Sequence, residues 1–310
     1  MLSVVLPCKN EAAALVLILP ELKLALPDAE IIVVNDGSTD NTAAVCRQFG
    51  VRMVQHNQSL GNGAAIKSGA RAATGDVIVF MDADGQHRPQ DVTRLLATYH
   101  EGYDMVVGAR SYASQAGVHR AVANSLYNWF ASWMVGRRVD DLTSGFRAVN
   151  SRKFRQFLYL LPNGFSYPTT ITMSFFRAGY SVTYLPIEAP PRIGKSHVRV
   201  FRDGVRFFLI IFKIGTLYAP LKLFLPVSLA FFLTGVGYYS YTFITAHRFT
   251  NMSATLFITS ILVFLMGLLS EQISALNYKD SDQVAGSDDG GDHLSRTRSE
   301  GAESTETKDG

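Results

Sequence analysis

The chain has 310 residues, of which 47% are hydrophobic and 18% are charged, and its formal net charge is +3. This apolar, charge-poor composition excludes an intrinsically disordered chain, and the presence of only two cysteines, Cys8 and Cys46, excludes a disulfide scaffold. The charge is uneven, because residues 277–310 hold nine acids and four bases and the preceding part of the chain is basic.

The first 190 residues are predicted to form an α/β domain. Short apolar runs are expected to form strands at 3–6, 30–35, 51–55, 76–81 and 104–108, with helices at 11–26, 40–49, 64–73 and 89–101. This alternation is typical of a mostly parallel sheet that is covered by helices. Such sheets bind ligands beyond the carboxyl ends of their strands, so the polar residues found there are the first candidates for a site.

Residues 191–222 combine regularly spaced bases with large apolar side chains. The bases recur at helical spacing, at Arg199, Arg202, Arg206 and Lys213, and phenylalanine and isoleucine occupy many of the positions between them. This pattern predicts an amphipathic interfacial helix, with its bases at lipid head groups. A core helix of the α/β domain is the alternative.

Residues 223–276 are expected to form a two-helix transmembrane hairpin. The stretches 223–246 and 249–270 carry no charged residue, and each is longer than the roughly 20 residues that cross a bilayer. Two helices buried in a large soluble core are the alternative.

The charge pattern predicts how the chain lies relative to the membrane. No apolar targeting segment opens the chain, and bases precede the first span, so we expect the α/β domain in the cytoplasm. Two spans return the C-terminus to the same side. Residues 277–310 are rich in Ser, Asp, Gly and Glu, and we expect them to form a disordered acidic tail.

An acidic pair follows the strand expected at 76–81. Asp82 and Asp84 are one residue apart, so on an extended strand both carboxylates point to the same side. A divalent cation relieves the repulsion between them, and oxygen ligands favour Mg²⁺ or Mn²⁺. An acidic loop that caps the following helix is the alternative.

Two further segments follow other strands. Asp36 stands at a strand end, where its carboxylate can accept a hydrogen bond from a base or a ribose, although a turn and helix cap also explain residues 35–40. Gly61 and Gly63 precede a helix whose N-terminus can bind an anion, although an ordinary tight turn explains them as well. This segment matches neither the Gly-x-Gly-x-x-Gly pattern nor a P-loop.

The most distinctive segments stand in the order VLPCKNE at 5–11, VNDGSTD at 34–40, DADGQHRP at 82–89, VGARSY at 107–112, DLTSGFR at 141–147 and RIGKS at 192–196. As a set they resemble the family 2 glycosyltransferases of GT-A fold, and most closely the dolichol-phosphate mannose synthase-like branch of polyprenyl-phosphate glycosyltransferases. The resemblance extends over about residues 1–275. Asn35 departs from it, because the family commonly has the first Asp of a pair there.

The resemblance implies a role for each group of residues. Those expected to bind the nucleotide sugar are Pro7, Asn10, Glu11, Asp36, Asp82, Ala83 and Asp84. Those expected to hold Mg²⁺ or Mn²⁺ are Asp82, Asp84 and Gln86. Those expected at the acceptor phosphate are Arg110, Arg120, Ser144, Arg192 and Lys195. Those expected to act in catalysis are Asp84, Arg110 and Asp141, with a general-base role of Asp141 left open.

The resemblance also implies a membrane-bound, inverting transfer of one hexose from a nucleotide sugar to a polyprenyl phosphate such as dolichyl or undecaprenyl phosphate. GDP-mannose, UDP-glucose and UDP-N-acetylglucosamine are the candidate donors. A processive polysaccharide synthase is one alternative, but the Gln-x-x-Arg-Trp motif of that class is absent. A non-enzymatic, membrane-anchored binding protein is another, but it has no need of these acids and arginines together. No nucleic acid is expected as a partner, and a homo-oligomer stays open.

Overall fold

The structure of the chain is a computed structural model that describes residues 1–110, 118–164, 167–188, 212 and 215–276, with the backbone alone for 118–124. Its strands are β1 (Leu2–Cys8), β2 (Glu30–Asp36), β3 (Arg52–His56), β4 (Val77–Phe80), β5 (Met105–Arg110), β6 (Arg147–Asn150) and β7 (Val182–Ile187). Its labelled helices are α1 (Ala12–Ala25), α2 (Thr42–Gln48), α3 (Asn62–Ala72), α4 (Pro89–Tyr99), α5 (Val118–Val135), α6 (Ser151–Gln156), α7 (Tyr167–Arg177) and α9 (Pro220–Ala246).

One seven-stranded sheet forms the centre of the α/β domain, with the strand order β3-β2-β1-β4-β6-β5-β7. Within the run β3-β2-β1-β4, each strand is parallel to the next. At the other end of the sheet, β7 is parallel to β5. β6 runs antiparallel to both of its neighbours, β4 and β5. The predicted mostly parallel sheet is therefore confirmed, with one reversed strand that the sequence pattern does not indicate.

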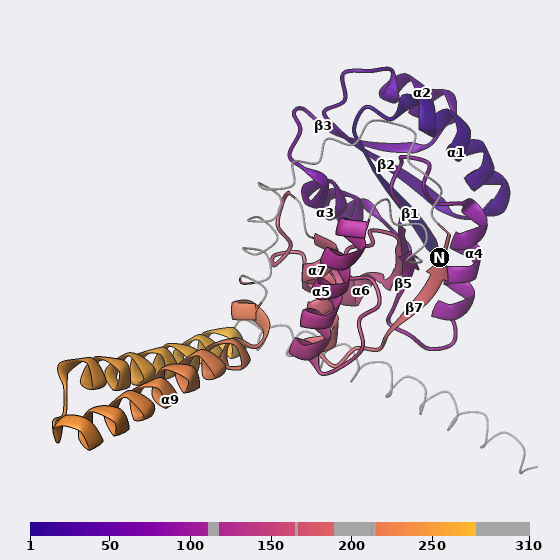
Figure 1. Cartoon of the computed structure of the whole chain (residues 1–310). Coiled ribbons are helices and arrows are strands. Elements are labelled where there is room, and N and C mark those ends of the chain that lie inside the picture. The colour runs from indigo at the N-terminus through magenta and orange to yellow at the C-terminus, as the bar shows by residue number, and fades with distance from the viewer. Residues whose placement is uncertain (111–117, 165–166, 189–211, 213–214, 277–310) are drawn as a thin grey trace, which may run out of the picture.

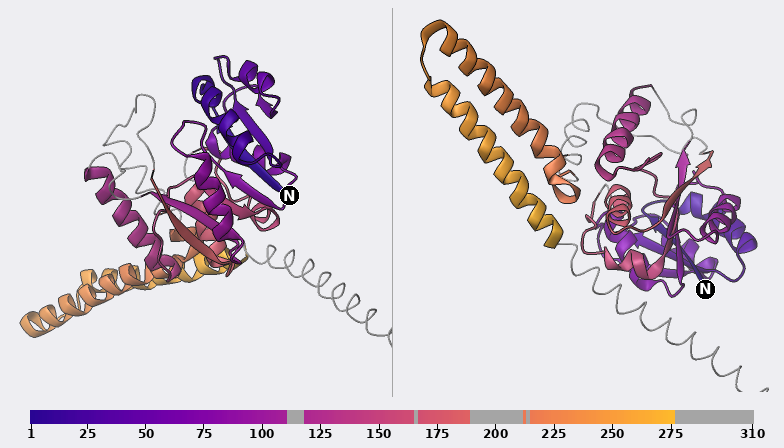
Figure 2. Two further views of the ribbon diagram at one scale, coloured as in Figure 1. Left: turned by 90° about the vertical axis from the view of Figure 1, so that its right-hand side faces the viewer. Right: turned by 90° about the horizontal axis from the view of Figure 1, so that it is seen from below.

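Helices cover both faces of this sheet (Figures 1 and 2). Along β1, Val5 packs on the face of α3, α5, α6 and α7, whereas Val4 and Leu6 pack on the face of α1, α2 and α4. Successive side chains of a strand point to opposite faces, so a strand that is buried on both sides is apolar throughout. This double burial explains the uninterrupted apolar run at residues 77–81.

Two long apolar helices project from the α/β domain as a hairpin (Figures 1 and 2). The first is α9, and the second covers Asn251–Leu276; both are long and apolar enough to cross a membrane. Only 11% of the apolar window of the first helix and 17% of that of the second are buried, which argues against helices of a soluble core. The predicted hairpin is present, and its first helix begins three residues before the expected start at 223.

Two predicted segments lie largely or wholly outside the described residues. Of the amphipathic region expected at 191–222, the structure describes residues 212 and 215–222. The acidic tail expected at 277–310 lies wholly outside them. The boundaries of these two segments stay predictions.

Candidate active site

The acidic pair lies in a turn that follows β4. The strand ends at Phe80, and the turn occupies residues 83–84. The backbone N–H of Gln86 donates to Oδ1 of Asp84 at 3.2 Å, which closes the turn. The extended geometry on which the shared orientation of Asp82 and Asp84 depended is therefore absent, because the strand ends at Phe80 and a turn follows.

The side chains of this turn divide between the surface and the core. Asp82, Asp84 and Gln86 are partly exposed. Ala83, which was expected to contact the nucleotide sugar, is 2% exposed and packs in the core on the face of α1 and α4. Any contact of Ala83 with a donor is therefore confined to its backbone.

Asp82, Asp84 and Gln86 offer two carboxylates and an amide as candidate metal ligands. Within the described ranges, no group of three or more His, Cys, Asp and Glu side chains is arranged to hold a metal ion. Mg²⁺ is usually bound by one or two carboxylates together with water and substrate phosphates, rather than by a complete protein cage. These residues therefore fit a cation that is shared with a bound diphosphate.

The loop of residues 141–146 lies against Asp82. A Cβ added to Gly145 would lie 3.1 Å from Oδ2 of Asp82, so a larger residue would crowd the carboxylate. His87 stacks on Phe146 with ring centroids 4.6 Å apart, and its Nε2 lies 3.9 Å from Oδ2 of Asp82. Burial lowers the pKa of His87 to about 4, so its ring is neutral at pH 7. His87 was not predicted as a site residue, and its place in the acidic motif is the only sequence signal for it.

Arg110 and Asp141 form a clamp beside this loop. Nε of Arg110 donates to Oδ2 of Asp141 at 2.9 Å, and Nη2 donates to Oδ1 at 3.2 Å. Thr143 and Ser144 also donate their backbone N–H groups to Oδ1 of Asp141. Burial acts to raise the pKa of Asp141, but these hydrogen bonds hold it below its usual range. A carboxylate held in this way is a weak base, and its hydrogen bonds fix the position of the Arg110 guanidinium.

The reversed strand β6 brings the clamp to the acids. Arg147, the first residue of β6, pairs with Phe80 at the end of β4 and with Val107 of β5. The residues before β6 therefore lie at the same edge of the sheet as the residues after β4 and β5. This edge unites Asp82, Asp84, Arg110 and Asp141, and we call it the acidic edge.

Arg147 is fully buried beneath the loop 141–146. It donates to the backbone oxygens of Ser144 and Pro168 and to Oγ1 of Thr172 on α7. Its guanidinium also lies 5.7 Å from the centre of the Tyr167 ring. Arg147 thus ties the loop to α7. The sequence motif contained Arg147, but a motif does not distinguish a buried arginine from an exposed one.

The structure describes only some of the residues that were predicted at the acceptor phosphate. Ser144 is 2% exposed, and its buried Oγ has no hydrogen-bond partner among the described residues, so its predicted role at the acceptor stays a prediction. Arg120 lies on α5 at a position where only the backbone is described. Arg192 and Lys195 lie outside the described residues. Of the predicted set, Arg110 is the one whose side chain the described structure places at the acidic edge.

Asp36 is engaged by the protein itself. Its Oδ1 accepts from Nδ1 of His56 at 2.7 Å and from the backbone N–H of Leu60 at 2.8 Å. Its Oδ2 accepts from Oγ of Ser59 at 2.7 Å and from the backbone N–H of Gly61 at 3.0 Å. The carboxylate is buried, so the structure does not support the expected direct contact with a nucleoside. Asp36 instead fixes the loop after β3, and its partner His56 was missed because only the fold brings it there.

Replacement of Asp36 by asparagine should destabilise the domain at neutral pH. Burial acts to raise the pKa of Asp36, but its hydrogen bonds hold the pKa at about 2, against an ordinary value of 3.8. The carboxylate therefore adds about 2 kcal/mol to the free energy of unfolding at pH 7. This contribution is present above about pH 4 and is lost as the pH falls to about 2. The wild type should thus melt several degrees above Asp36→Asn at pH 7, and the gap should shrink in acid.

The control for this comparison is Asp28→Asn, which changes an exposed acid before β2. This variant should melt at the same temperature as the wild type, both at pH 7 and in acid. Equal melting temperatures of the wild type and Asp36→Asn at pH 7 would show that the network around Asp36 contributes nothing to stability.

The loops after β1 and β2 are fastened to each other. Oδ1 of Asn10 accepts from the backbone N–H of Thr39 at 2.7 Å. Asp40 accepts from the backbone N–H of Ala12 at 3.1 Å and from that of Thr42, the first residue of α2, at the same distance. The side chain of Asn10, expected at the nucleotide sugar, therefore has a structural partner, and Asp40 holds the starts of α1 and α2 together.

Pro7 and Glu11 are the other residues that were expected at the donor. Pro7 lies near the end of β1, Glu11 lies directly before α1, and both are partly exposed. Because β1 and β4 are parallel neighbours, both residues lie toward the same edge of the sheet as Asp82. This position is compatible with the predicted contact to a nucleoside, which stays a prediction.

The glycines before α3 are explained by packing. The backbone N–H groups of Gly63 and Ala64 donate to the backbone oxygens of Gly164 and Asn163, respectively. A Cβ added to Gly63 would lie 2.0 Å from the backbone oxygen of Pro162. The first turn of α3 is thus occupied by the segment 162–164, which favours the tight-turn interpretation of this motif over an anion site.

Substitution of Gly63 by alanine should lower the melting temperature, because the added methyl group overlaps the oxygen of Pro162. Overpacking of this kind costs about 1–3 kcal/mol. Gly164→Ala is the matched control, since a Cβ at Gly164 meets no atom within 4 Å. Thermal melts of the two variants test the difference, and a stable Gly63→Ala protein would contradict the packing argument.

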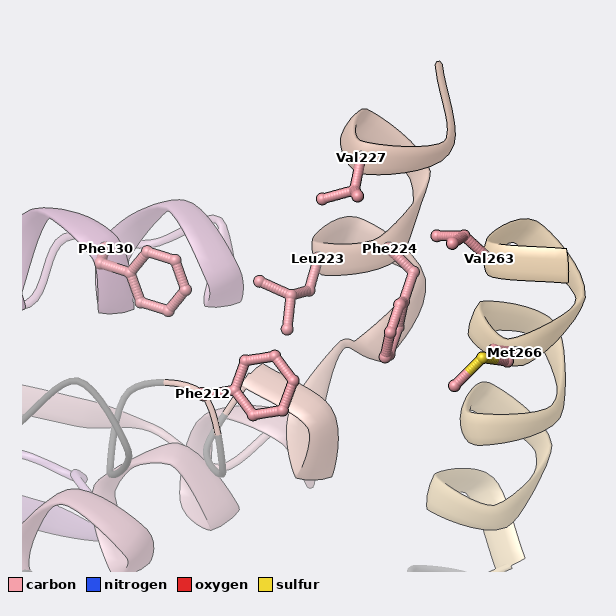
Figure 3. Close-up of a pocket in the computed structure, with 7 residues that line it drawn as sticks. All are labelled: Phe130, Phe212, Leu223, Phe224, Val227, Val263 and Met266. Atoms are coloured by element: carbon pink, nitrogen blue, oxygen red, sulfur yellow. The ribbon is translucent and has the colours of Figure 1, made fainter. Parts of the chain in front are cut away.

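An apolar groove of about 400 Å³ lies where the hairpin meets the α/β domain (Figure 3). It is lined by α5, the segment at 212, α9 and the second apolar helix, through Phe130, Phe212, Leu223, Phe224, Val227, Val263 and Met266. On α5, Leu126, Trp129 and Trp133 are exposed at helical spacing. An apolar surface therefore continues from the hairpin onto the α/β domain, and none of the residues just named belongs to the acidic edge.

The fold and the acidic edge together define the class of the molecule. The chain is similar to glucosyl-3-phosphoglycerate synthase from Mycobacterium tuberculosis, solved with Mn²⁺, UDP and glucosyl-3-phosphoglycerate, with a TM-score of 0.54. The identity is 24%, over 68% of this chain and 77% of that chain, and the likeness concerns the fold. The class that the fold defines is therefore a GT-A-like α/β domain with an acidic pair after a central strand.

The chain belongs to glycosyl transferase family 2, whose model matches residues 3–161. A second model, the GtrB C-terminal hairpin, matches residues 219–276. The chain is 28% identical to glycosyltransferase AglJ of Haloferax volcanii, over 80% of this chain and 86% of that relative.

Two further relatives carry more specific names. The chain is 29% identical to the polyprenol monophosphomannose synthase of Mycolicibacterium smegmatis, over 61% of this chain and 77% of that relative. It is 28% identical to the undecaprenyl-phosphate mannosyltransferase of Micrococcus luteus, over 65% of this chain and 93% of that relative. The predicted family and the predicted enzyme class are therefore confirmed.

Proposed function

We propose that the protein is a membrane-bound, inverting glycosyltransferase that moves one hexose from a nucleotide sugar to a polyprenyl phosphate. The observation that carries the proposal is the acidic edge, where the pair Asp82 and Asp84 meets the clamp of Arg110 and Asp141. Carboxylates suit a cation-bound diphosphate, and a guanidinium suits a phosphate monoester. An edge that offers both fits a reaction between a nucleotide sugar and a phosphate-bearing acceptor.

The residues of the acidic edge have different roles in the proposed reaction. Asp82, Asp84 and Gln86 would hold Mg²⁺ or Mn²⁺, which when bound neutralises charge on the departing nucleoside diphosphate. Arg110, held by Asp141, orients the acceptor phosphate. A phosphate monoester is an anion near neutral pH, so it needs orientation more than proton removal. Its oxygen bonds to the anomeric carbon as the bond to the diphosphate breaks on the opposite face, which inverts the configuration.

The lipid nature of the acceptor is supported by three observations. The relatives from Mycolicibacterium smegmatis and Micrococcus luteus are named for polyprenol or undecaprenyl phosphate. The second model that the chain matches is a C-terminal hairpin, and both helices are long enough to span. The apolar groove at the root of the hairpin offers a surface on which an isoprenoid chain can lie.

We propose a two-span topology in which the α/β domain, residues 1–190, and the tail, residues 277–310, face the cytoplasm. Residues 191–222 would lie in the interface and residues 223–276 in the bilayer. The support for this orientation is the cluster of bases before the first span.

The proposal is tested by supplying the full chain in membranes with undecaprenyl phosphate and, in turn, labelled GDP-mannose, UDP-glucose and UDP-N-acetylglucosamine. We expect one of the three labels to appear in a lipid extract as a single sugar, β-linked to phosphate when the donor is α-linked. Label that accumulates in polymer would favour a processive synthase, and the absence of label from both fractions for every donor would favour a binding protein.

A further inference from the structure

Each apolar helix of the hairpin contains one charged residue, and both residues lie at the end next to the α/β domain. Lys222 is the charge within Pro220–Ala246, and Glu271 is the charge within Asn251–Leu276. A charged side chain in a membrane-spanning helix is costly and usually has a function and a partner. The partners of these two residues therefore indicate what they do.

Glu271 joins the two helices of the hairpin to α7. Its Oε1 lies 3.7 Å from Nη2 of Arg177, the last residue of α7. Its Oε2 accepts from the backbone N–H of Leu221 in the first turn of α9, at 3.3 Å. Arg177 also donates to the backbone oxygen of Tyr218, two residues before α9. One carboxylate thus caps the first apolar helix, belongs to the second and pairs with the α/β domain.

Lys222 joins the hairpin to α5. Its Nζ donates to the backbone oxygens of Trp133 at 3.3 Å and of Met134 at 3.0 Å. Both oxygens belong to the last turn of α5, where the helix dipole favours a positive charge. Figure 1 shows the hairpin leaving the α/β domain beside α5 and α7.

The helix that Lys222 holds is bonded to the acidic edge. On α5, Nδ2 of Asn128 donates to the backbone oxygen of Asp140 at 2.6 Å. Oδ1 of Asn128 accepts from the backbone N–H of Leu142 at 3.0 Å. These two bonds flank Asp141, the residue that orients Arg110. A continuous set of contacts therefore runs from the hairpin through α5 to the clamp.

The hairpin itself is closely packed, so a constraint at its root applies to its whole length. Oγ of Ser228 donates to the backbone oxygen of Ser260, and Oγ of Ser260 donates to that of Ser228, both at 2.9 Å. A Cβ added to Gly267 would lie 2.8 Å from Cβ of Phe224, so the helices approach closely there.

We propose that Glu271 and Lys222 are positioning residues that fix the orientation of the α/β domain relative to the bilayer, so that the phosphate of a membrane-embedded acceptor reaches Arg110. This inference rests on the proposed function, because it concerns how that acceptor reaches the acidic edge. It implies that the two residues matter when the acceptor is confined to the membrane and do not matter when the acceptor diffuses in water.

The test compares two acceptors in proteoliposomes that contain the full chain: undecaprenyl phosphate in the bilayer and water-soluble geranyl phosphate. Glu271→Gln removes the charge and keeps the size, and Lys222→Met acts on the other helix. We expect each variant to lower transfer to undecaprenyl phosphate by at least about tenfold, as misplacement of a substrate does. Transfer to geranyl phosphate should stay at the wild-type rate. Arg52→Gln removes the ion pair between Arg52 on the edge strand β3 and Glu30 of β2; it is the matched control and should change neither rate.

A second measurement, the quenching of tryptophan fluorescence, reports the position of α5 relative to the bilayer and does not depend on activity. Trp129 and Trp133 are the two tryptophans of the chain, and both lie on α5. Brominated lipids quench tryptophans that lie near the bilayer, so the quenching of the wild type should differ from that of Glu271→Gln and Lys222→Met.

The outcomes separate this inference from the proposed function. Variants that match the wild type on both acceptors, or that lose both activities in equal measure, overturn the positioning role, as does unchanged quenching. A wild-type protein that transfers sugar to neither acceptor overturns the proposed function, and the inference with it.

Discussion

Replacement of Asp84 by alanine is expected to lower sugar transfer by at least about 100-fold, and EDTA should have the same effect on the wild type. A catalytic cation contributes several kcal/mol of charge stabilisation, and each 1.36 kcal/mol is about tenfold in rate. Asp84 lies on the surface of the turn after β4, so its removal leaves the core of the domain intact. Turnover of the nucleotide sugar, followed through the lipid product, is the measurement.

Asp28→Ala is the control for Asp84→Ala, because Asp28 is an exposed acid at the opposite edge of the sheet, before β2. It should retain full activity and full sensitivity to EDTA. The melting temperature and the membrane fraction of both variants should equal those of the wild type. Full activity in EDTA, or a near-normal rate of Asp84→Ala, would remove the metal from the proposed mechanism.

Replacement of Arg110 by lysine should also lower transfer by about 100-fold, although the charge is kept. The guanidinium donates through Nε and Nη2 to the two oxygens of Asp141, and an ammonium cannot reproduce this planar geometry. The loss should appear mainly as weaker use of the acceptor phosphate, so kcat/KM for the acceptor is the quantity to measure. Arg52→Lys, at the far edge of the sheet, is the control.

The pH dependence of transfer by Asp141→Asn tests the role of Asp141. The hydrogen bonds of Asp141 hold its pKa below the ordinary range, so it is ionised at neutral pH. If Asp141 only orients Arg110, Asp141→Asn should weaken transfer without changing the pH profile between about pH 6 and 8. A pH limb that disappears in Asp141→Asn would show that Asp141 acts as a base.

The first half of the sheet could be predicted because its signals are local. Each strand from β1 to β5 is a short apolar run, and a helical pattern follows each strand from β1 to β4. The strand expected at 30–35 is observed at Glu30–Asp36, and the strand expected at 104–108 at Met105–Arg110. The rule that ligands lie beyond strand ends selected the acids after β4 as candidates, and the structure places them near Arg110.

The second half could not be predicted, because its signals are tertiary. β6 has four residues, and its strand partners β4 and β5 precede it by many residues in the sequence. Its direction brings the loop 141–146 to the site, and no local pattern encodes a direction. The role of Asp36 depends in the same way on donors that follow β3. An acid at a strand end is visible in the sequence, but the groups that surround it are set by the fold.

The direction of β6 has a consequence for how enzymes of this architecture can diversify. The loops that are still expected to contact the donor follow β1 and β4, both within the first 90 residues, whereas the clamp belongs to the segments around β5 and β6. Recombination at a point in α4 would therefore exchange the acceptor half of the enzyme and leave the nucleotide half intact. Chimaeras joined there, between this chain and a relative that uses another acceptor, should inherit the sugar from the N-terminal parent and the lipid from the C-terminal one.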